Sequence, residues 1–191
     1  MGVFQSQDIQ SCINYNDIQN DYEDENYEIY PPDYNTPLSI ITINNIKYDC
    51  IYYDTPNNKK IKWIVPIINN KRHGTFTSFW INGKSYTICE YKNGKKNGKC
   101  ISYNNNGLLR LISYYFNDEL NGVFEQYQDY NNFSYLLSRT YFLNGLMNGT
   151  YTTYFIPDGK IKSTIQFING RKKGKYIEFD KNNNIIEIIK Y

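Results

Sequence analysis

The sequence predicts an all-β protein, an elongated single-layer antiparallel β-meander preceded by an irregular acidic N-terminal arm. The 191 residues include 26 isoleucines and 21 tyrosines but no alanine. Alanine is the strongest helix former, whereas Ile, Tyr and Phe favour strands. In addition, eight of the twelve glycines directly follow an asparagine, and Asn-Gly is typical of tight turns between antiparallel strands.

The first segment, residues 1–38, is expected to be a poorly structured arm because it is polar and acidic. Residues 1–46 contain eight Asp or Glu and no Lys or Arg, so the rest of the chain has a net charge of +10, although the whole chain has only +2. Such an arm either folds back onto the basic body or stays solvated.

The second segment, residues 39–191, is predicted to be a repeat domain with about five clear copies from residue 67 onward and one degenerate copy before them. Five six-residue segments align without gaps, and each begins with Asn and ends with Gly: 69–74, 93–98, 117–122, 144–149 and 169–174. We interpret their closing glycines as structural. They are Gly74, Gly98, Gly122, Gly149 and Gly174, at steps of 24, 24, 27 and 25 residues.

The flanks of these segments repeat as well. An aromatic residue stands five positions after each closing glycine: Phe79, Tyr103, Tyr127, Tyr154 and Phe179. A second turn signal lies midway between the glycines, and the three-residue surplus of the 27-residue step falls at 129–132, which we expect to be a solvent loop. Each period therefore encodes two strands and two primed turns, giving about twelve strands between residues 47 and 190.

Residues 91–99 and 167–176 each read as an aromatic strand, Asn-Gly, three variable residues with a closing Gly, and the start of a second strand. In this pattern the chain resembles divergent members of the MORN repeat family. The resemblance implies hairpin repeats that act as a scaffold, a dimerisation module or a membrane-associated platform; similar repeats occur in bacterial proteins classed as antitoxins. The stricter repeat has a further glycine, which is replaced here by Phe76, Cys100, Phe124, Tyr151 and Tyr176, so lipid binding is not transferred.

No pattern in the sequence indicates catalysis, a cofactor or a metal, and we expect a protein that is not an enzyme. The four cysteines form no CxxC pair, and His73 is the single histidine. We expect reduced packing thiols, although Cys89 and Cys100 could lie opposite each other across a hairpin, where a disulfide is geometrically allowed.

Two short motifs lie in the arm. Gly2 with Ser6 matches the N-myristoylation pattern. Pro31, Pro32 and Tyr34 match the PPxY form that WW domains bind, unless the prolines simply end a linker. With a composition biased towards Asn, Ile, Lys and Tyr, the acylation pattern favours an origin in a large DNA virus of a protist.

Basic residues recur in the same turn of three copies and are predicted to line one edge of the sheet: Lys71, Arg72, Lys95, Lys96, Arg171, Lys172 and Lys173. Such a ridge could contact an anionic membrane or the acidic arm, or it could simply be solvated. Nucleic acid is disfavoured because the aromatic residues are needed for the sheet.

The leading functional hypothesis is a non-enzymatic scaffold that presents a partly basic β surface to a protein or membrane partner. The alternatives are a myristoylated viral adaptor that recruits WW-domain proteins and an antitoxin-like binding partner. The last strand, 185–189, has isoleucine on both faces, which predicts homodimerisation through this edge or coverage by the arm. Lacking a secretory signal and a run of about 18 apolar residues, the protein is expected in the cytoplasm of a host or in a virion, with peripheral membrane contact if Gly2 is acylated.

Overall fold

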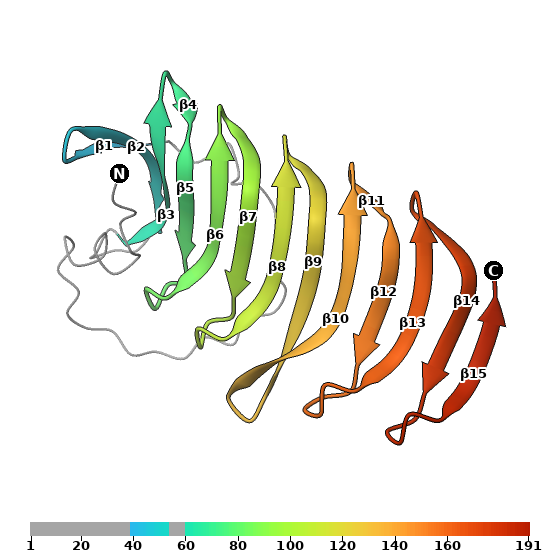
Figure 1. Cartoon of the computed structure of the whole chain (residues 1–191). Helices are drawn as coiled ribbons and strands as arrows, with labels where there is room; N and C mark the ends of the chain where they lie inside the picture. Colours follow the sequence, from blue (N-terminus) through green and yellow to red (C-terminus); the bar gives the residue numbers. More distant parts are fainter. Residues whose placement is uncertain (1–38, 54–59) are drawn as a thin grey trace.

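The computed structural model describes residues 39–53 and 60–191, and every regular element within them is a β-strand. Fifteen strands form one open antiparallel sheet. Thirteen follow one another in chain order, while the short strands β4 and β11 pair with β3 and β10 beside this path. The predicted all-β meander is confirmed, and Figure 1 shows its hairpins following one another along an extended, curved ribbon.

The strands have the following bounds. The N-terminal third contains β1 (Ser39–Ile43), β2 (Ile46–Tyr52), β3 (Ile61–Ile68), β4 (Lys71–Arg72) and β5 (Gly74–Phe79). The middle contains β6 (Ser85–Lys92), β7 (Lys95–Tyr103), β8 (Leu109–Phe116), β9 (Glu119–Tyr130) and β10 (Phe133–Leu143). The C-terminal third contains β11 (Leu146–Met147), β12 (Gly149–Tyr154), β13 (Ile161–Ile168), β14 (Arg171–Phe179) and β15 (Ile185–Lys190).

The degenerate first copy corresponds to β2 and β3, and its predicted turn at 56–58 lies outside the described residues. The structure adds a hairpin that the repeat pattern did not predict. Strands β1 and β2 are joined by Asn44 and Asn45, whose φ angles are 49° and 63°. Asparagine adopts positive φ more readily than most residues, so this Asn-Asn step was the available signal.

The turns at the upper edge of the ribbon, as drawn in Figure 1, follow β3, β6, β8, β10 and β13. Both central residues have positive φ, as with Asn93 (53°) and Gly94 (88°) or Asn117 (51°) and Asp118 (74°). Two consecutive positive φ angles match the right-handed twist of the flanking strands. The primed turns predicted from the six-residue segments are confirmed here.

The lower-edge turns that follow β5, β7, β12 and β14 are built differently from the prediction. After β5, Trp80 N–H donates to Lys84 O at 2.8 Å, Gly83 N–H donates to Trp80 O at 2.8 Å, and Gly83 has a φ of 86°. Its neighbour Asn82 does not have positive φ. This arrangement is a three-residue loop closed by one left-handed residue, not a primed two-residue turn.

The three-residue surplus of the 27-residue step also takes a different form from the prediction. Strand β9 runs to Tyr130, β10 starts at Phe133, and the turn between them consists of Asn131 (φ 50°) and Asn132 (φ 62°). The extra residues therefore lengthen two paired strands and do not form a solvent loop. Paired backbone groups satisfy their hydrogen bonds without water, and the register joins Tyr130 to Phe133 directly.

A β-bulge recurs near the lower edge in every second strand of the path. In each hairpin that turns at the lower edge, one residue of the second strand has no partner in the register, whereas the first strand skips none. The skipped residues are Lys62, Tyr86, Arg110, Leu137, Lys162 and Ile186. A bulge increases local twist, and its repetition helps to explain the ribbon's steady curvature.

The two faces of the sheet carry different side chains, since successive residues of a strand point to opposite faces. We call one the cysteine face. It carries the buried cluster of Ile51, Trp63, Val65, Phe76, Cys89 and Cys100. The other, the isoleucine face, carries a second buried cluster with Ile64 and a cross-strand column of Ile88, Ile101 and Ile112. In the part of the chain that the structure describes, Ile165 is the one buried apolar residue beyond Cys100.

Candidate functional site

The arm motifs cannot be placed, because Gly2, Pro31, Pro32 and Tyr34 lie outside the described residues. Among residues 39–53 and 60–191, no group of three or more His, Cys, Asp and Glu could hold a metal ion. The same residues contain no helix that is long and apolar enough to span a membrane.

The basic residues of the upper edge divide into two classes. In the first position after each primed turn, Lys71, Lys95 and Arg171 pair with Ile68, Lys92 and Ile168 and are exposed. These three side chains are available to a ligand. Lys173 of the predicted ridge, which pairs with Gln166, is exposed as well.

In the second position, the basic side chains lie over aromatic rings. Arg72 Cζ lies 4.8 Å from the Trp63 ring centroid, and Lys96 Nζ lies 4.9 Å from that of Tyr115. Lys172 Nζ lies 4.7 Å from the Tyr191 centroid. Burial lowers the pKa of Lys96, and the charge of Asp118 partly opposes this effect.

The two middle copies show what this second position requires. There, Leu120 pairs with Tyr115, and Met147 pairs with Phe142. Leucine and methionine are suited to apolar contact with the aromatic residue opposite them, whereas lysine and arginine in the other copies lie over a ring through their stems and the cation–π attraction. Contact with an aromatic residue of the sheet therefore accounts for the residue type at this second position, although the sequence pattern placed the position in a basic ridge.

Backbone hydrogen bonds connect successive upper-edge turns. We call this row of hydrogen bonds along the upper edge the rail. Asp118 N–H donates to Lys96 O at 3.0 Å, and Gly145 N–H donates to Leu120 O at 2.8 Å. The same bond links Gly94 to Arg72 and Gly170 to Met147, each at 2.8 Å. Because every turn is bonded to the preceding one, this edge is positioned by the neighbouring copy.

Asparagine side chains add to the rail, a role that the sequence pattern alone did not reveal. Asn121 Nδ2 donates to Asn144 Oδ1 at 3.2 Å, and Asn97 Nδ2 donates to Asn117 Oδ1 at 3.4 Å. The donors are the asparagines directly before the closing glycines. The fixed spacing of these asparagines is visible in the sequence, but it predicted only the turn geometry and not the hydrogen bonds between turns.

Three of the closing glycines lie against a side chain on the neighbouring strand. A Cβ on Gly122 would lie 2.9 Å from Tyr114 Cβ, and one on Gly149 would lie 3.6 Å from Tyr141 Cβ. On Gly98, a Cβ would meet the Glu90 side chain. The positive φ angles of these three glycines, from 123° to 128°, also disfavour any residue with a side chain.

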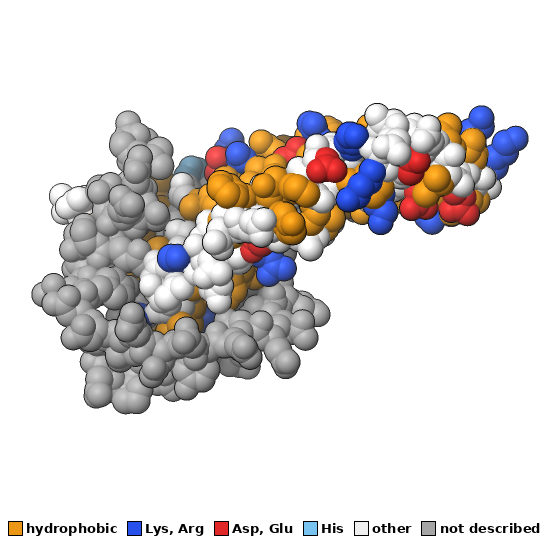
Figure 2. Space-filling model, turned by 90° about the horizontal axis from the view of Figure 1, so that it is seen from below, with side chains coloured by type: hydrophobic (Ala, Val, Ile, Leu, Met, Phe, Trp, Pro, Cys, Tyr) orange, Lys and Arg blue, Asp and Glu red, His pale blue; other side chains and the backbone are white. Residues whose placement is uncertain are grey.

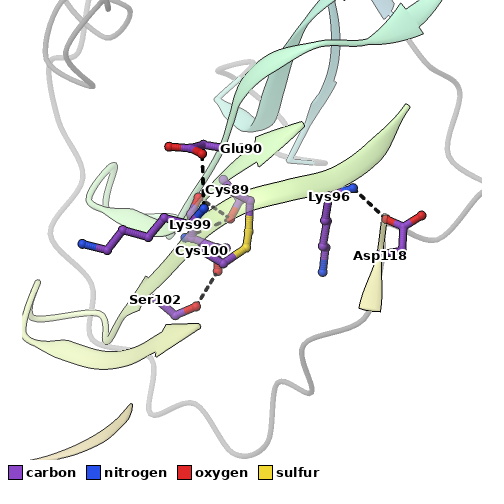
Figure 3. The surroundings of a disulfide bond; sticks show 9 residues. Cys89, Glu90, Lys96, Lys99, Cys100, Ser102 and Asp118 are labelled. Carbon is purple, nitrogen blue, oxygen red and sulfur yellow. Dashed lines mark hydrogen bonds between the residues drawn. A yellow bond between two sulfur atoms is a disulfide. The ribbon is translucent and has the colours of Figure 1, made fainter. Parts of the chain in front are cut away.

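Cys89 and Cys100 form a disulfide between β6 and β7, with their Cα atoms 4.2 Å apart (Figure 3). The predicted position opposite each other is confirmed, but the expectation of reduced thiols is wrong for this pair. The register places the residues directly opposite each other, whereas the sequence argument had relied on the compartment. Cys50 is free and buried.

A charged pair interrupts the isoleucine column. The column continues from Ile112 to Glu125 and Arg139, whose Nε lies 3.4 Å from Glu125 Oε1. The Tyr127 hydroxyl donates to Glu125 Oε2 at 3.0 Å. Burial, together with this carboxylate, raises the pKa of Tyr127 to about 12.

The long β9–β10 hairpin carries exposed aromatic side chains at its tip. Tyr130 and Phe133 are opposite each other, with exposed fractions of 46% and 66%. The Tyr135 ring meets that of Tyr130 edge-on at 6.2 Å, and alternation places all three on one face. Seen from below, hydrophobic side chains gather midway along the molecule, where this hairpin lies (Figure 2).

Strand β15 forms one edge of the described sheet and is exposed along its whole length. Its four isoleucines are all exposed: Ile185, Ile186, Ile188 and Ile189. Like charges are directly opposed within the β14–β15 hairpin, at Lys175 with Lys190 and at Glu178 with Glu187. Directly opposed like charges destabilise a sheet slightly. Contacts within the β14–β15 hairpin alone therefore do not account for the residues found on β15.

No protein-family model matches the chain, and no match is found among the curated proteins. Among solved structures, the chain is similar to the pneumococcal O-GlcNAc transferase GtfA in complex with UDP and GlcNAc, at 16% identity over 63% of this chain and 20% of that one, with a TM-score of 0.29. It is also similar to the GtfA/B complex, at 13% identity over 81% of this chain and 24% of that one, with a TM-score of 0.28. The chain spans about a quarter or less of these proteins.

Proposed function

We propose that the protein is a non-enzymatic scaffold of divergent MORN-type hairpin copies that binds another protein through the sheet surface. The observation that carries this proposal is the long β9–β10 hairpin, which departs from the repeat and presents the exposed Tyr130 and Phe133 with the half-buried Tyr135 beside them. Exposed aromatic residues dominate the energetics of protein–protein contacts because they bury much area with few rotatable bonds.

The proposal assigns the basic positions a secondary role. The basic first-position residues, Lys71, Lys95 and Arg171, are exposed, so they supply a sparse row of charge beside the sheet. Charges at the rim of an interface act mainly on the rate of association and on specificity. An acidic or neutral protein surface with an apolar pocket fits both features.

The membrane-tethered adaptor remains a prediction that depends on Gly2, Pro31, Pro32 and Tyr34, outside the described residues. The antitoxin-like role also remains a prediction, since no contact in the described sheet favours it. Intact mass of the protein expressed in a eukaryotic cell tests acylation, and an unmodified N-terminus would remove the tether.

Quantitative affinity capture from the native host tests the scaffold proposal. Full-length wild type would be compared with Phe133→Ser and with Leu146→Ser, a matched loss of an exposed apolar side chain at the upper edge. We expect a protein retained by wild type and Leu146→Ser to be depleted at least about tenfold with Phe133→Ser, because a central aromatic contact contributes about 2 kcal/mol or more. Identical profiles for the three proteins would contradict the role of this hairpin.

A further inference from the structure

Eight Asn-Gly steps lie in the part of the chain that the structure describes, and each is chemically reactive. Glycine has no Cβ, so its backbone nitrogen can approach the Cγ of the preceding asparagine without hindrance. Attack by that nitrogen closes a succinimide ring, which is the first step of deamidation. The eight steps are Asn82-Gly83, Asn93-Gly94, Asn97-Gly98, Asn106-Gly107, Asn121-Gly122, Asn144-Gly145, Asn148-Gly149 and Asn169-Gly170.

Hydrogen bonds of the rail hold the side chains of five of these asparagines. Asn97, Asn121 and Asn148 are donors, and the bond from Asn148 Nδ2 to Asn169 Oδ1 is 3.5 Å long. Asn144 and Asn169 are acceptors. Cyclisation requires the side chain to turn its Cγ towards the glycine nitrogen. A side chain that is bonded to the neighbouring copy must first break that bond, which raises the barrier.

The other three steps fall into two classes. At the lower edge, Asn82 Oδ1 accepts a hydrogen bond from Lys84 N–H at 3.0 Å, and Asn82 Nδ2 donates to Asn105 O at 2.8 Å. Asn93 and Asn106 are both exposed, and among the described residues neither side chain has a hydrogen-bond partner. Six asparagine side chains are therefore held, and these two are not.

The missing bond at Asn93 has a cause in the sequence. In the later copies, an asparagine directly before the closing glycine donates to the next turn, as Asn121 does to Asn144. The equivalent position before Gly74 holds His73. Among the described residues, no hydrogen bond joins His73 to Asn93, so the first side-chain link of the series is absent.

We propose that Asn93 and Asn106 are the deamidation sites of this chain and that the side-chain bonds protect the other six steps. In the reaction, the glycine N–H gives its proton to hydroxide as the nitrogen bonds to Cγ. Nδ2 takes a proton from water and leaves as ammonia, which regenerates hydroxide. Water then opens the ring at either carbonyl, and the product is aspartate or isoaspartate.

Three upper-edge turns provide an internal comparison, because they differ mainly in this side-chain bond. Asn93, Asn144 and Asn169 have φ angles of 53°, 49° and 48°. The glycine N–H that follows each of them donates to a carbonyl of the preceding copy at 2.8 Å. The bonds to Oδ1 of Asn144 and Asn169 are therefore the difference that we expect to set the rates.

Deamidation at these two sites would change the edges of the sheet. At Asn93, the new carboxylate lies between the exposed Lys92 and Lys95 in the sequence and lowers the positive charge of the upper edge. An isoaspartate also lengthens the backbone of a two-residue turn. At Asn106, the altered peptide contains the carbonyl that accepts a hydrogen bond from Lys84 Nζ at 3.0 Å. The inference is independent of the proposed scaffold function, because it needs no partner.

Incubation of the full-length native chain at mildly alkaline pH, followed by tandem mass spectrometry, tests the proposal. Asn93 and Asn106 should deamidate about two- to tenfold faster than Asn144 and Asn169, which is the factor expected from one neutral hydrogen bond. In concentrated urea, where the side-chain bonds are lost, the four rates should converge. Hydroxylamine, which cleaves the chain at a succinimide, gives a second readout at the same sites.

Substitutions at His73 test the protective bond directly. His73→Asn supplies the missing donor and should slow deamidation of Asn93 to the rate of Asn144, whereas His73→Ala, the matched control, should leave it fast. If His73→Asn does not fold, Asn121→Ala serves instead, because it frees Asn144 and should raise its rate to that of Asn93. Equal native rates at Asn93 and Asn144, a rate at Asn93 that His73→Asn leaves unchanged, or slower reaction at Asn106 than at a held asparagine would overturn the proposal.

Discussion

Gly122 is expected to be among the least replaceable residues of the sheet, and Gly122→Ala gives the sharpest test of the repeat geometry. Its φ of 128° lies far outside the left-handed well near 57°, and a non-glycine residue in such a region costs about 1–3 kcal/mol. The new Cβ would also lie 2.9 Å from Tyr114 Cβ, against an optimum near 3.5–4.0 Å, and overpacking of this kind costs about 1–3 kcal/mol.

Gly145→Ala provides the matched control. Gly145 also has a positive φ, 77°, but an added Cβ would meet nothing within 4 Å, so we expect a loss of about 1–2 kcal/mol. Both substitutions reduce the entropy of the unfolded chain equally. Urea denaturation followed by circular dichroism should therefore show Gly122→Ala less stable than Gly145→Ala by about 2–3 kcal/mol at an unchanged m-value.

Second substitutions at Tyr114 separate backbone strain from steric contact. Tyr114→Gly removes the Cβ that the new methyl group would meet, so it should recover part of the loss in the Gly122→Ala background. Tyr114→Ala keeps that Cβ and should recover less. Equal losses at Gly122 and Gly145, or equal recovery by both second substitutions, would refute the reasoning.

Three further predictions concern individual interactions. The folded-state pKa of Tyr127 is about 12, against an ordinary value of 10.0. Its contribution to stability is therefore complete below pH 10 and is lost as pH rises towards 12. In urea titrations at several pH values, Tyr127→Phe should reduce the fall in unfolding free energy over that range. Replacing both Cys89 and Cys100 by serine opens a crosslink of sequence separation 11 and should cost about 2–3 kcal/mol in melts without reductant; an unchanged melting temperature would contradict this, and wild type with reductant is the control. Lys96→Met should leave the free energy of unfolding within about 1 kcal/mol of wild type, because methionine lies opposite an aromatic residue at the equivalent position. Lys96→Asp should lower the free energy of unfolding through repulsion by Asp118. Equal losses in the two variants would contradict a covering role for the Lys96 side chain.

Part of the candidate site was predictable from spacing, and part was not. The five aligned segments placed Lys71, Arg72, Lys95 and Lys96 at one edge, where the structure has them. The sequence did not distinguish an exposed Lys95 from a Lys96 that lies over Tyr115. Adjacent residues of a strand point to opposite faces, and a residue's neighbours on its face come from the next copy, so the distinction depends on register.

The long hairpin shows the same limit. Counting residues located the surplus of the 27-residue step at 129–132, but insertion into a loop and insertion into paired strands give the same count. The structure extends β9 to Tyr130 and starts β10 at Phe133. Aromatic and β-branched residues on both sides favour pairing, and an Asn-Asn step can turn the chain in two residues.

By itself, the sequence determined the all-β class, the repeat period and the position of nearly every reversal, because Asn, Gly and alternating apolar residues act locally on φ and on the face that a side chain occupies. The tertiary structure alone decided the recurring bulges, the rail of hydrogen bonds between turns, the Cys89–Cys100 disulfide and the partner of each basic side chain. These features depend on register between strands that are adjacent in space, and a shift of one residue would exchange the two faces of the sheet.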